Sequence, residues 1–234
     1  ACLQGAIGYI QYFNDVPALL VGIHVAGATA VMFWSSWLLL DTHRAGAERV
    51  AVAPGDMVHM DIKKLGRIPD GGGWRKLGRG NDKTKGHSGV GYAYLHHVVD
   101  DCSRLAYSEI LGDEKKDTVA GFWNRARDCF TGYGIEISRV MTDNGPCYLS
   151  ADFKHAIRAV GAEHIRTRPY TPQTNGKAER LIRTLLQEWA YAQAYRSSHW
   201  RTSALKRYLN YYNGERRHSA LGMQPPFARL AERL

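Results

Sequence analysis

Cysteine is scarce in this chain, and the spacing of the few cysteines excludes two kinds of site. The sequence has four, widely separated and without a C-x-x-C pair: Cys2, Cys102, Cys129 and Cys147. Neither a zinc site nor a disulfide scaffold fits that pattern. A cleavable signal is also missing, because no basic segment precedes the first apolar run. We therefore expect reduced thiols in a cytosolic domain.

Acidic residues are outnumbered, with 22 Asp and Glu against 31 Lys and Arg and a net charge of +9. Residues 1–45 hold only Asp15, Asp41 and Arg44, which leave that segment at −1 and the remainder at +10. Such an excess favours a polyanionic partner, most simply nucleic acid, although many basic proteins never touch DNA. The partner is expected to bind beyond residue 45.

Charge is absent altogether from residues 16–40, a run of 25 residues without Asp, Glu, Lys or Arg. That length suffices to span a bilayer, and the alternative is a buried helix of a soluble protein. Arg44 and Arg49 follow the run while Asp15 precedes it, which favours a cytoplasmic C-terminal side. We predict one transmembrane helix and membrane association through residues 16–40.

Residues 11–28, around His24, resemble the last membrane segment of bacterial haem A synthases. The resemblance covers about residues 1–43 and implies that His24 corresponds to a haem ligand. A haem site needs a helix bundle and further ligands, which this chain does not supply, so haem is not expected as a cofactor. The composition changes abruptly between residues 42 and 55, and we interpret this change as the start of a different protein.

Beyond that junction, β-prone and helical patterns alternate, as in α/β proteins. Strands are expected at residues 57–65, 90–99, 104–111, 135–141 and 163–167, and helices at 116–130, 151–160, 177–189 and 200–212. Residues 66–89, with eight Gly and six Lys or Arg, read as a long basic loop. This loop either contacts phosphate or is a solvated insertion.

Three acids occupy distinctive places in this pattern. Asp61 lies within a β-prone run, Asp143 ends a strand before an Asn-Gly turn, and Glu179 begins an amphipathic helix. An acid in a buried strand is costly without a partner or a metal. Carboxylates are the ligands that Mg²⁺ or Mn²⁺ prefers, and a pair of such ions catalyses phosphoryl transfer. Each acid alone has an ordinary structural reading, so their combination carries the prediction.

The residues around these acids resemble a known family. Met-Asp-Ile-Lys at 60–63, Thr-Asp-Asn-Gly at 142–145 and Thr-Pro-Gln-Thr-Asn-Gly-Lys-Ala-Glu-Arg at 171–180 are similar to the three blocks of DDE insertion-sequence transposases, which share the retroviral integrase core. The 35 residues between Asp143 and Glu179 match that group, and residues 209–226 resemble its closing segment. The resemblance covers about residues 50–230.

That resemblance implies a ribonuclease H-like fold, a mixed five-stranded sheet flanked by helices. It implies that Asp61, Asp143 and Glu179 are catalytic ligands of Mg²⁺, for which Mn²⁺ can substitute. The implied activity is DNA strand cleavage followed by transfer of the 3′-hydroxyl to target DNA, by a homo-oligomer assembled on DNA in the cytoplasm. We expect a membrane-segment-like region, a linker, an integrase catalytic core and a helical extension at residues 1–45, 46–55, 56–195 and 196–234.

Candidate DNA contacts lie near the acids and in the basic loop: Lys63, Lys64, Arg75, Lys76, Asn144, Asn175, Lys177, Arg180 and Arg183. Phosphate contact and ordinary solvation are alternatives for each cation. Some relatives carry a Lys or Arg seven residues after the third acid, where this chain has Leu186. Helix-turn-helix modules usually precede the core in this group, and here residues 1–45 take that place, so poor sequence discrimination is expected.

Several other readings remain open from the sequence. Asp101 reads as a turn acid or a catalytic one, and packing is expected for four histidines: His59, His96, His97 and His164. An inactive fusion remnant of an insertion element and a membrane-protein gene is the alternative function, suggested by the junction near residue 45. A general nuclease with the same fold is a third hypothesis.

Overall fold

The computed structural model describes residues 53–78, 90–167 and 175–233, together with Thr29 and Met32. Residues 51–234 belong to one compact unit. The predicted membrane span at residues 16–40 and its His24 lie outside the described residues, except for Thr29 and Met32. Among the residues described, no helix is both long enough and apolar enough to cross a bilayer.

A mixed five-stranded sheet forms the centre of the unit, with strand order β3-β2-β1-β4-β5. The strands are β1 (Val58–Gly66), β2 (Tyr92–Asp100), β3 (Ala106–Leu111), β4 (Arg139–Thr142) and β5 (Glu163–Arg166). The pairs β1-β2 and β2-β3 are antiparallel, while β1-β4 and β4-β5 are parallel. Parallel neighbours need long crossovers, which here contain helices. The predicted mixed sheet is confirmed.

Side chains of β1 alternate between two hydrophobic clusters, one on each face of the sheet. Val58 and Met60 belong to the first cluster, and Leu65 to the second. The same alternation directs Asp61 toward the face that carries Leu65. The acid within this strand thus points to the side of the second cluster.

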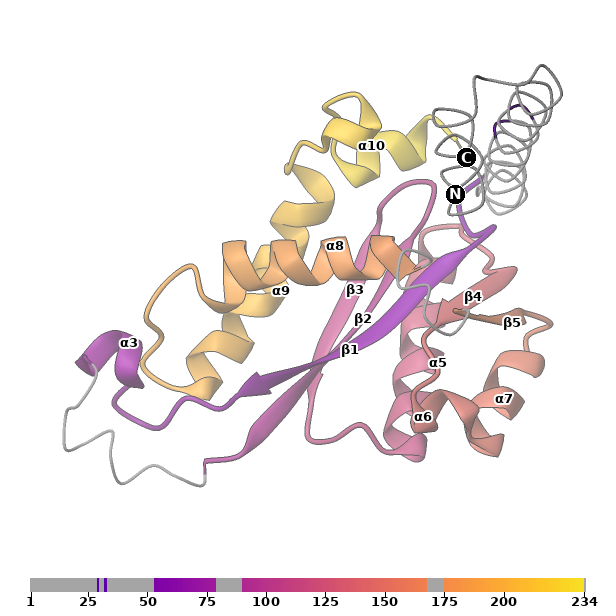
Figure 1. Cartoon of the computed structure of the whole chain (residues 1–234). Coiled ribbons are helices and arrows are strands. Elements are labelled where there is room, and N and C mark those ends of the chain that lie inside the picture. Colours follow the sequence, from indigo (N-terminus) through magenta and orange to yellow (C-terminus); the bar gives the residue numbers. More distant parts are fainter. Residues whose placement is uncertain (1–28, 30–31, 33–52, 79–89, 168–174, 234) are drawn as a thin grey trace, which may run out of the picture. The chain divides into compact units, whose positions relative to one another are not determined.

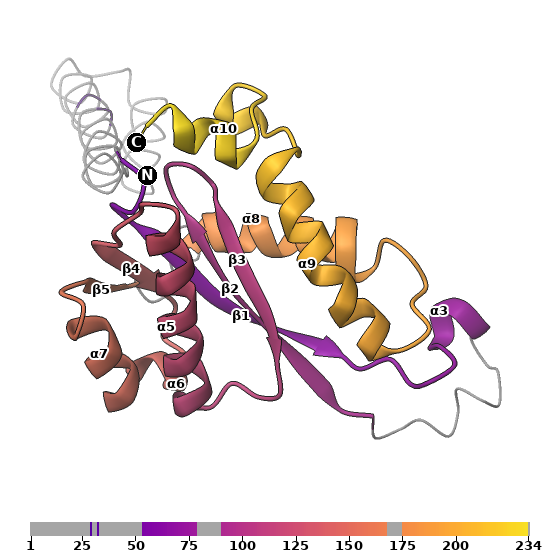
Figure 2. The ribbon, with the colours of Figure 1, turned by 180° about the vertical axis from the view of Figure 1, so that it is seen from behind.

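Three helices cover the first face: α5 (Lys116–Gly132), α6 (Pro146–Leu149) and α7 (Ala151–Arg158) (Figures 1 and 2). The buried stripe of α5 has helical spacing and consists of Val119, Phe122, Trp123, Ala126 and Phe130. Ser150 begins α7, where its Oγ accepts a hydrogen bond of 3.2 Å from the Phe153 N–H. This capped amphipathic layer shields the first cluster from water.

The second face is covered by α8 (Gly176–Leu185), a π-helical turn (Leu186–Ala190) and α9 (Ser198–Gly214). Leu181, Leu185 and Trp189 pack with Leu65 and Leu95 in the second cluster. The predicted extension, residues 196–234, contributes α9, a short 3₁₀ turn (Ser219–Leu221) and α10 (Pro226–Ala231). Leu230 of α10 joins the first cluster.

Three details differ from the sequence-based expectations. Residues 66–89 are not a loop throughout, because α3 (Trp74–Leu77) forms within them. The strand expected from residue 135 begins only at Arg139, since Ile135 and Ile137 are buried in the first cluster without pairing in the sheet. The helix expected to run through Trp189 widens into the π-helical turn at Leu186.

Candidate active site

The register between β1 and β4 aligns two of the three predicted acids. His59 pairs with Met141 in the parallel ladder. Asp61 lies two residues after His59, and Asp143 lies two residues after Met141. Because the two strands are parallel, residues equally far beyond a paired position lie at the same level of the sheet. Both carboxylates therefore lie where β1 and β4 separate, at the C-terminal end of β4. Open α/β sheets commonly build their sites at this edge.

Glu179 approaches from the helical layer on the second face. It lies in the first turn of α8 and is exposed. The helix contacts both β1 and β2. Negative charge is favoured at this end of a helix by the macrodipole. The third acid therefore comes from the layer toward which Asp61 points.

The charges of the three acids influence one another. Asp61 is half-buried, and burial raises the pKa of its carboxyl. The Ile62 N–H, which donates to Asp61 Oδ1 over 2.7 Å, opposes that rise, whereas the negative charges of Asp143 and Glu179 add to it. The resulting pKa of Asp61 is about 6. Asp61 is thus within electrostatic range of both other acids.

The turn after β4 fixes the second acid. Asp143 Oδ1 accepts a hydrogen bond of 2.8 Å from the Gly145 N–H. A Cβ atom at position 145 would lie only 3.0 Å from that oxygen, which explains the glycine. Asn144 Nδ2 donates to the Thr167 carbonyl over 2.9 Å, which ties the turn to the end of β5. The Asp-Asn-Gly run thus orients its carboxylate by local contacts.

The donor chemistry of the trio fits a divalent ion with oxygen ligands. Three carboxylates whose charges oppose one another gain from a cation between them. Among the residues that the structure describes, however, no three His, Cys, Asp or Glu side chains already form a ligand set. Asp61 and Asp143 each turn Oδ1 toward a backbone N–H.

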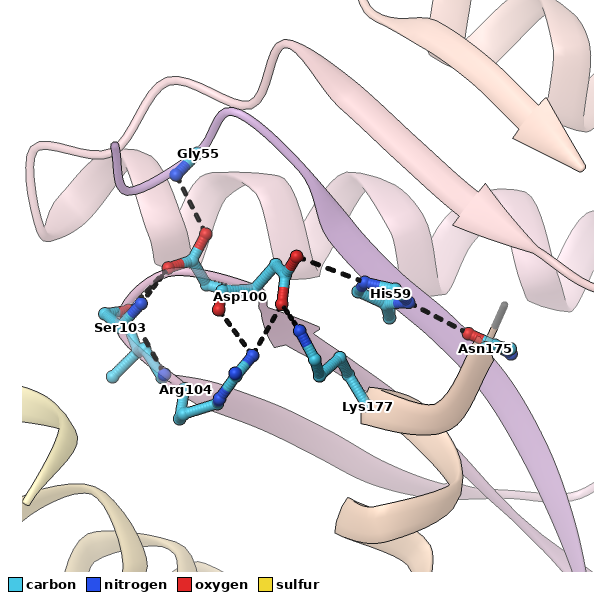
Figure 3. Close-up of polar contacts among 9 residues, drawn as sticks. Gly55, His59, Asp100, Ser103, Arg104, Asn175 and Lys177 are labelled. Carbon is cyan, nitrogen blue, oxygen red and sulfur yellow. Dashed lines mark hydrogen bonds and ion pairs between the residues drawn. The ribbon is translucent and has the colours of Figure 1, made fainter. Parts of the chain in front are cut away.

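A buried polar network holds the start of α8 against the sheet (Figure 3). His59 Nδ1 lies 3.1 Å from Asn175 Oδ1, and since an amide oxygen only accepts, Nδ1 is assigned as the donor. His59 Nε2 lies 3.8 Å from Asp101 Oδ2. Lys177 and Arg104 both donate to Asp101 Oδ1. Asn175 and Lys177 flank the first turn of α8, so the network sets the position of Glu179.

The charge state of Asp101 follows from these partners. Burial on its own raises the pKa of the Asp101 carboxyl. The contacts with His59, Lys177 and Arg104 outweigh burial and hold that pKa well below its usual range. Asp101 is therefore ionised, and its carboxylate contacts two cations, Lys177 and Arg104, and the imidazole of His59. This favours the turn-acid reading over a catalytic one.

Its neighbour Asp100 organises the turn between β2 and β3. One carboxylate oxygen accepts from the Gly55 N–H over 2.8 Å, and the other accepts from the Ser103 N–H and Oγ over 2.6 and 2.7 Å. Burial raises the pKa of Asp100, and these hydrogen bonds only partly offset it. The pair Asp100-Asp101 is thus structural, in line with the turn-acid reading of Asp101.

The predicted DNA contacts fall into two groups in the structure. Three have internal partners: Asn175 and Lys177 in the network at the start of α8, and Asn144 on the Thr167 carbonyl. The other six are exposed cations: Lys63, Lys64, Arg75, Lys76, Arg180 and Arg183. Of these, Arg75 also has an internal partner, because it donates to the Tyr191 carbonyl. Lys63 is near enough to Asp61 for its charge to lower that pKa.

Three of the four histidines, His59, His96 and His164, have a hydrogen-bond partner, and the fourth, His97, is packed in the interior. His96 Nε2 lies 2.8 Å from the Asp113 carbonyl, and His164 Nε2 lies 2.8 Å from Thr142 Oγ1. His97 is fully buried, and burial lowers its pKa to about 3. It is the cross-strand partner of Asp61. A neutral imidazole therefore lies beside Asp61 on the neighbouring strand.

Comparison with known proteins identifies the family to which this arrangement belongs. Two family profiles, both described as the integrase core domain, match residues 51–172 and 160–226. The first covers more than half of the chain. The chain belongs to the integrase core domain family. The predicted extent of the family resemblance, about residues 50–230, agrees with these matches.

Curated relatives of this integrase core include viral and bacterial proteins. The chain is 34% identical over 92 residues to the Pol-related polyprotein of the mouse intracisternal A-particle MIA14, which is 39% of the chain and 10% of that protein. It is 29% identical over 140 residues to a putative transposase InsD for insertion element IS2E of Escherichia coli, 58% of the chain and 64% of that protein. The chain spans less than two thirds of the length of either relative.

Solved structures share the fold of this integrase core. A chain of the simian T-cell lymphotropic virus intasome superposes with a TM-score of 0.58 at 19% identity, covering 78% of this chain and 56% of that one. The catalytic core domain of BIV integrase gives a TM-score of 0.51 at 19% identity, covering 76% and 95%. The predicted ribonuclease H-like, integrase-type fold is thereby confirmed.

Proposed function

We propose that this chain is the catalytic core of a DNA transposase or integrase, which cleaves a DNA strand with water and joins the freed 3′-hydroxyl to target DNA. The observation that carries the proposal is the alignment of Asp61 with Asp143 across β1 and β4, with the charges of Asp143 and Glu179 both acting on Asp61. Both steps are in-line displacements at phosphorus that differ only in the nucleophile. Membership of the integrase core domain family supports this reading.

Asp61, Asp143 and Glu179 would hold Mg²⁺, for which Mn²⁺ can substitute. Bound divalent ions supply charge neutralisation and activation of the attacking and leaving oxygens. The protein contributes the placement of the acids: the Gly145 N–H orients Asp143, and the network around Asp101 fixes α8. A solved neighbour, the HTLV-2 integrase catalytic core domain, is described in complex with magnesium. This likeness supports the assignment of the ion.

Exposed cations near the acids would bind DNA phosphates. Lys63 lies on β1 beside Asp61, and Arg180 and Arg183 lie on α8 beside Glu179. Phosphate contacts add affinity without sequence information and make binding steeply dependent on salt. The chain is expected to bind duplex DNA in this manner and to discriminate sequence poorly.

The assembly and location follow from the same proposal. The chain would act as a homo-oligomer assembled on DNA, in the cytoplasm and on the nucleoid. The likeness to a chain of a viral intasome supports assembly on DNA.

A joining assay tests the proposal. Full-length chain is incubated with Mg²⁺, blunt duplex DNA and a supercoiled plasmid, and insertion of the duplex into the plasmid is measured. Wild-type chain should insert DNA ends, Asp143→Asn should not, and Asp152→Asn on α7 serves as the matched control with normal activity. Degradation without joining would indicate a nuclease. A chain that neither cleaves nor joins any DNA end would favour the inactive fusion remnant.

A further inference from the structure

A groove of about 740 Å³ lies at the far end of β1 from its junction with β4. Its walls come from the segment that follows β1, from α3, from the start of β2 and from the segment after the π-helical turn. Figures 1 and 2 place α3 at this end of the sheet, away from α6 and α7. The groove is therefore separate from the three acids.

The charge of the groove is of one sign. Among the described residues that line it are four cations and no acid: Arg67, Arg75, Lys76 and Arg201. Arg201 is only 2% exposed, and its Nη2 donates to the Gly66 carbonyl over 2.9 Å. No carboxylate within the described ranges forms an ion pair with it. A buried cation without a counter-charge is costly, and an anion in the groove would relieve that cost.

The groove also presents flat aromatic surface. Trp74 is 51% exposed, Tyr92 56% and Tyr191 39%, and all three line it. Large exposed rings on a soluble protein often mark a binding surface. Rings interleaved with cations are the pattern that binds nucleic acid strands, because bases stack on the rings while phosphates meet the cations.

One arginine organises this surface. The Arg75 guanidinium lies over two rings, 5.4 Å from the Trp74 centroid and 4.6 Å from the Tyr191 centroid. Its Nη1 donates to the Tyr191 carbonyl over 2.8 Å. These contacts join α3 to the segment after the π-helical turn. The rings are thus held in place before a ligand arrives, which lowers the entropic cost of binding.

The distance from the acids can be estimated along two elements. Gly66 lies five positions after Asp61 along β1, which is about 17 Å in a strand. Ala190, at the other wall, lies eleven positions after Glu179, which is about 16 Å in a helix. The two estimates agree, so the groove lies about 17 Å from the acids.

We propose that this groove binds unpaired nucleotides of the DNA substrate, about 17 Å from the phosphate at the three acids. The proposal rests on the proposed function for its substrate. Only unpaired bases can use the rings, because the faces of paired bases are covered within the duplex stack. The groove therefore selects DNA whose strands have separated near the reacting phosphate. Its cations contact the DNA phosphates, and the bases stack on Trp74, Tyr92 and Tyr191.

Binding measurements without catalysis test the groove. Full-length chain in EDTA is titrated with fluorescent 12-mers of three kinds: oligothymidylate, duplex DNA and oligouridylate. Trp74→Ala should weaken oligothymidylate binding roughly tenfold and duplex binding less than twofold. Tyr92→Ser is a second variant of the same kind. Trp200→Ala is the matched control, since Trp200 is 58% exposed but does not line the groove.

The outcomes separate this proposal from the proposed function. Normal oligothymidylate binding by both Trp74→Ala and Tyr92→Ser would contradict the proposal that the groove binds unpaired nucleotides, even if DNA joining is intact. Equal losses for duplex and single strand would overturn its selectivity, and tighter binding of oligouridylate would make RNA the occupant. A Trp74-dependent preference for single-stranded DNA in a chain that fails to join DNA would support the groove and refute the proposed function.

Discussion

The Lys177 ammonium donates a hydrogen bond to the Asp101 carboxylate, which ties the first turn of α8 to the turn between β2 and β3. Asp101 is almost fully buried, whereas the Lys177 side chain is 41% exposed. Two residues after Lys177 stands Glu179, the acid that must reach the other two. A structural ion pair therefore positions a proposed metal ligand.

Removing the lysine should cost both stability and joining activity. Lys177→Gln should lower the free energy of unfolding by only about 1 kcal/mol, because the partly exposed ammonium is screened by solvent. DNA joining should fall more than that loss implies, since the start of α8 is released. Urea denaturation and the joining assay measure the two effects. Lys116→Gln is the control, because its pair with Asp152 is exposed on both sides.

Much of this arrangement was predictable from the sequence, and the reasons differ by element. Asp143 was placed at a strand end because apolar residues run up to a turn-forming Asn-Gly, which is a local signal. The pairing of Lys177 with Asp101 joins residues 76 positions apart, and no local pattern announces it. The register that aligns Asp61 with Asp143 likewise depends on how two strands meet. The three acids could thus be predicted from the sequence, but the long-range contacts that position them could not.

The groove was missed for a related reason. The Gly-rich composition of residues 66–89 favours a loop, and a helix of four residues leaves little periodicity to detect. Trp74 and Tyr191 come together only because the segment after the π-helical turn folds back toward α3. Tertiary packing overrode the local expectation there.

Asp61 should limit stability when metal is absent. Asp61→Asn removes one of three opposed charges, so it should raise the melting temperature in EDTA. Adding Mg²⁺ should raise the melting temperature of the wild-type chain, because a ligand that binds only the folded state stabilises it. The variant should show no such rise. Differential scanning fluorimetry with and without Mg²⁺ checks both halves, and a rise for Asp61→Asn equal to the wild type would exclude Asp61 as a ligand.

Asn213 should be a large contributor to stability. Its Oδ1 accepts from the Ala106 N–H over 2.9 Å, and its Nδ2 donates to the Ala106 carbonyl over 2.8 Å. The side chain thereby replaces a neighbouring strand at the edge strand β3. Asn213→Ala leaves both backbone groups unpaired and should cost about 2 to 3 kcal/mol of unfolding free energy. The exposed Asn210→Ala on α9 should cost far less in the same urea titration.

Stability should fall in mild acid, in part through His218. Burial, followed by the charge of Arg216, lowers the pKa of His218 to about 4. Between pH 6.5 and about 4, His218 is therefore protonated in the unfolded chain but neutral in the folded chain. Unfolding free energy should drop by up to about 1.4 kcal/mol per pH unit in that window from this residue. His218→Phe, which keeps a ring against Tyr212, should flatten the profile. His155→Phe, at an exposed site, should leave it unchanged.

The central claim is that Asp61, Asp143 and Glu179 act as one unit, and the joining rates of single and double variants test it most directly. Residues that act together give losses that do not multiply. Asp61→Asn, Asp143→Asn and Glu179→Gln should each reduce Mg²⁺-dependent joining by at least about 10³-fold, and Asp61→Asn with Glu179→Gln should be no slower than either alone. Substantial joining by Glu179→Gln, or losses that multiply in the double variant, would contradict the account.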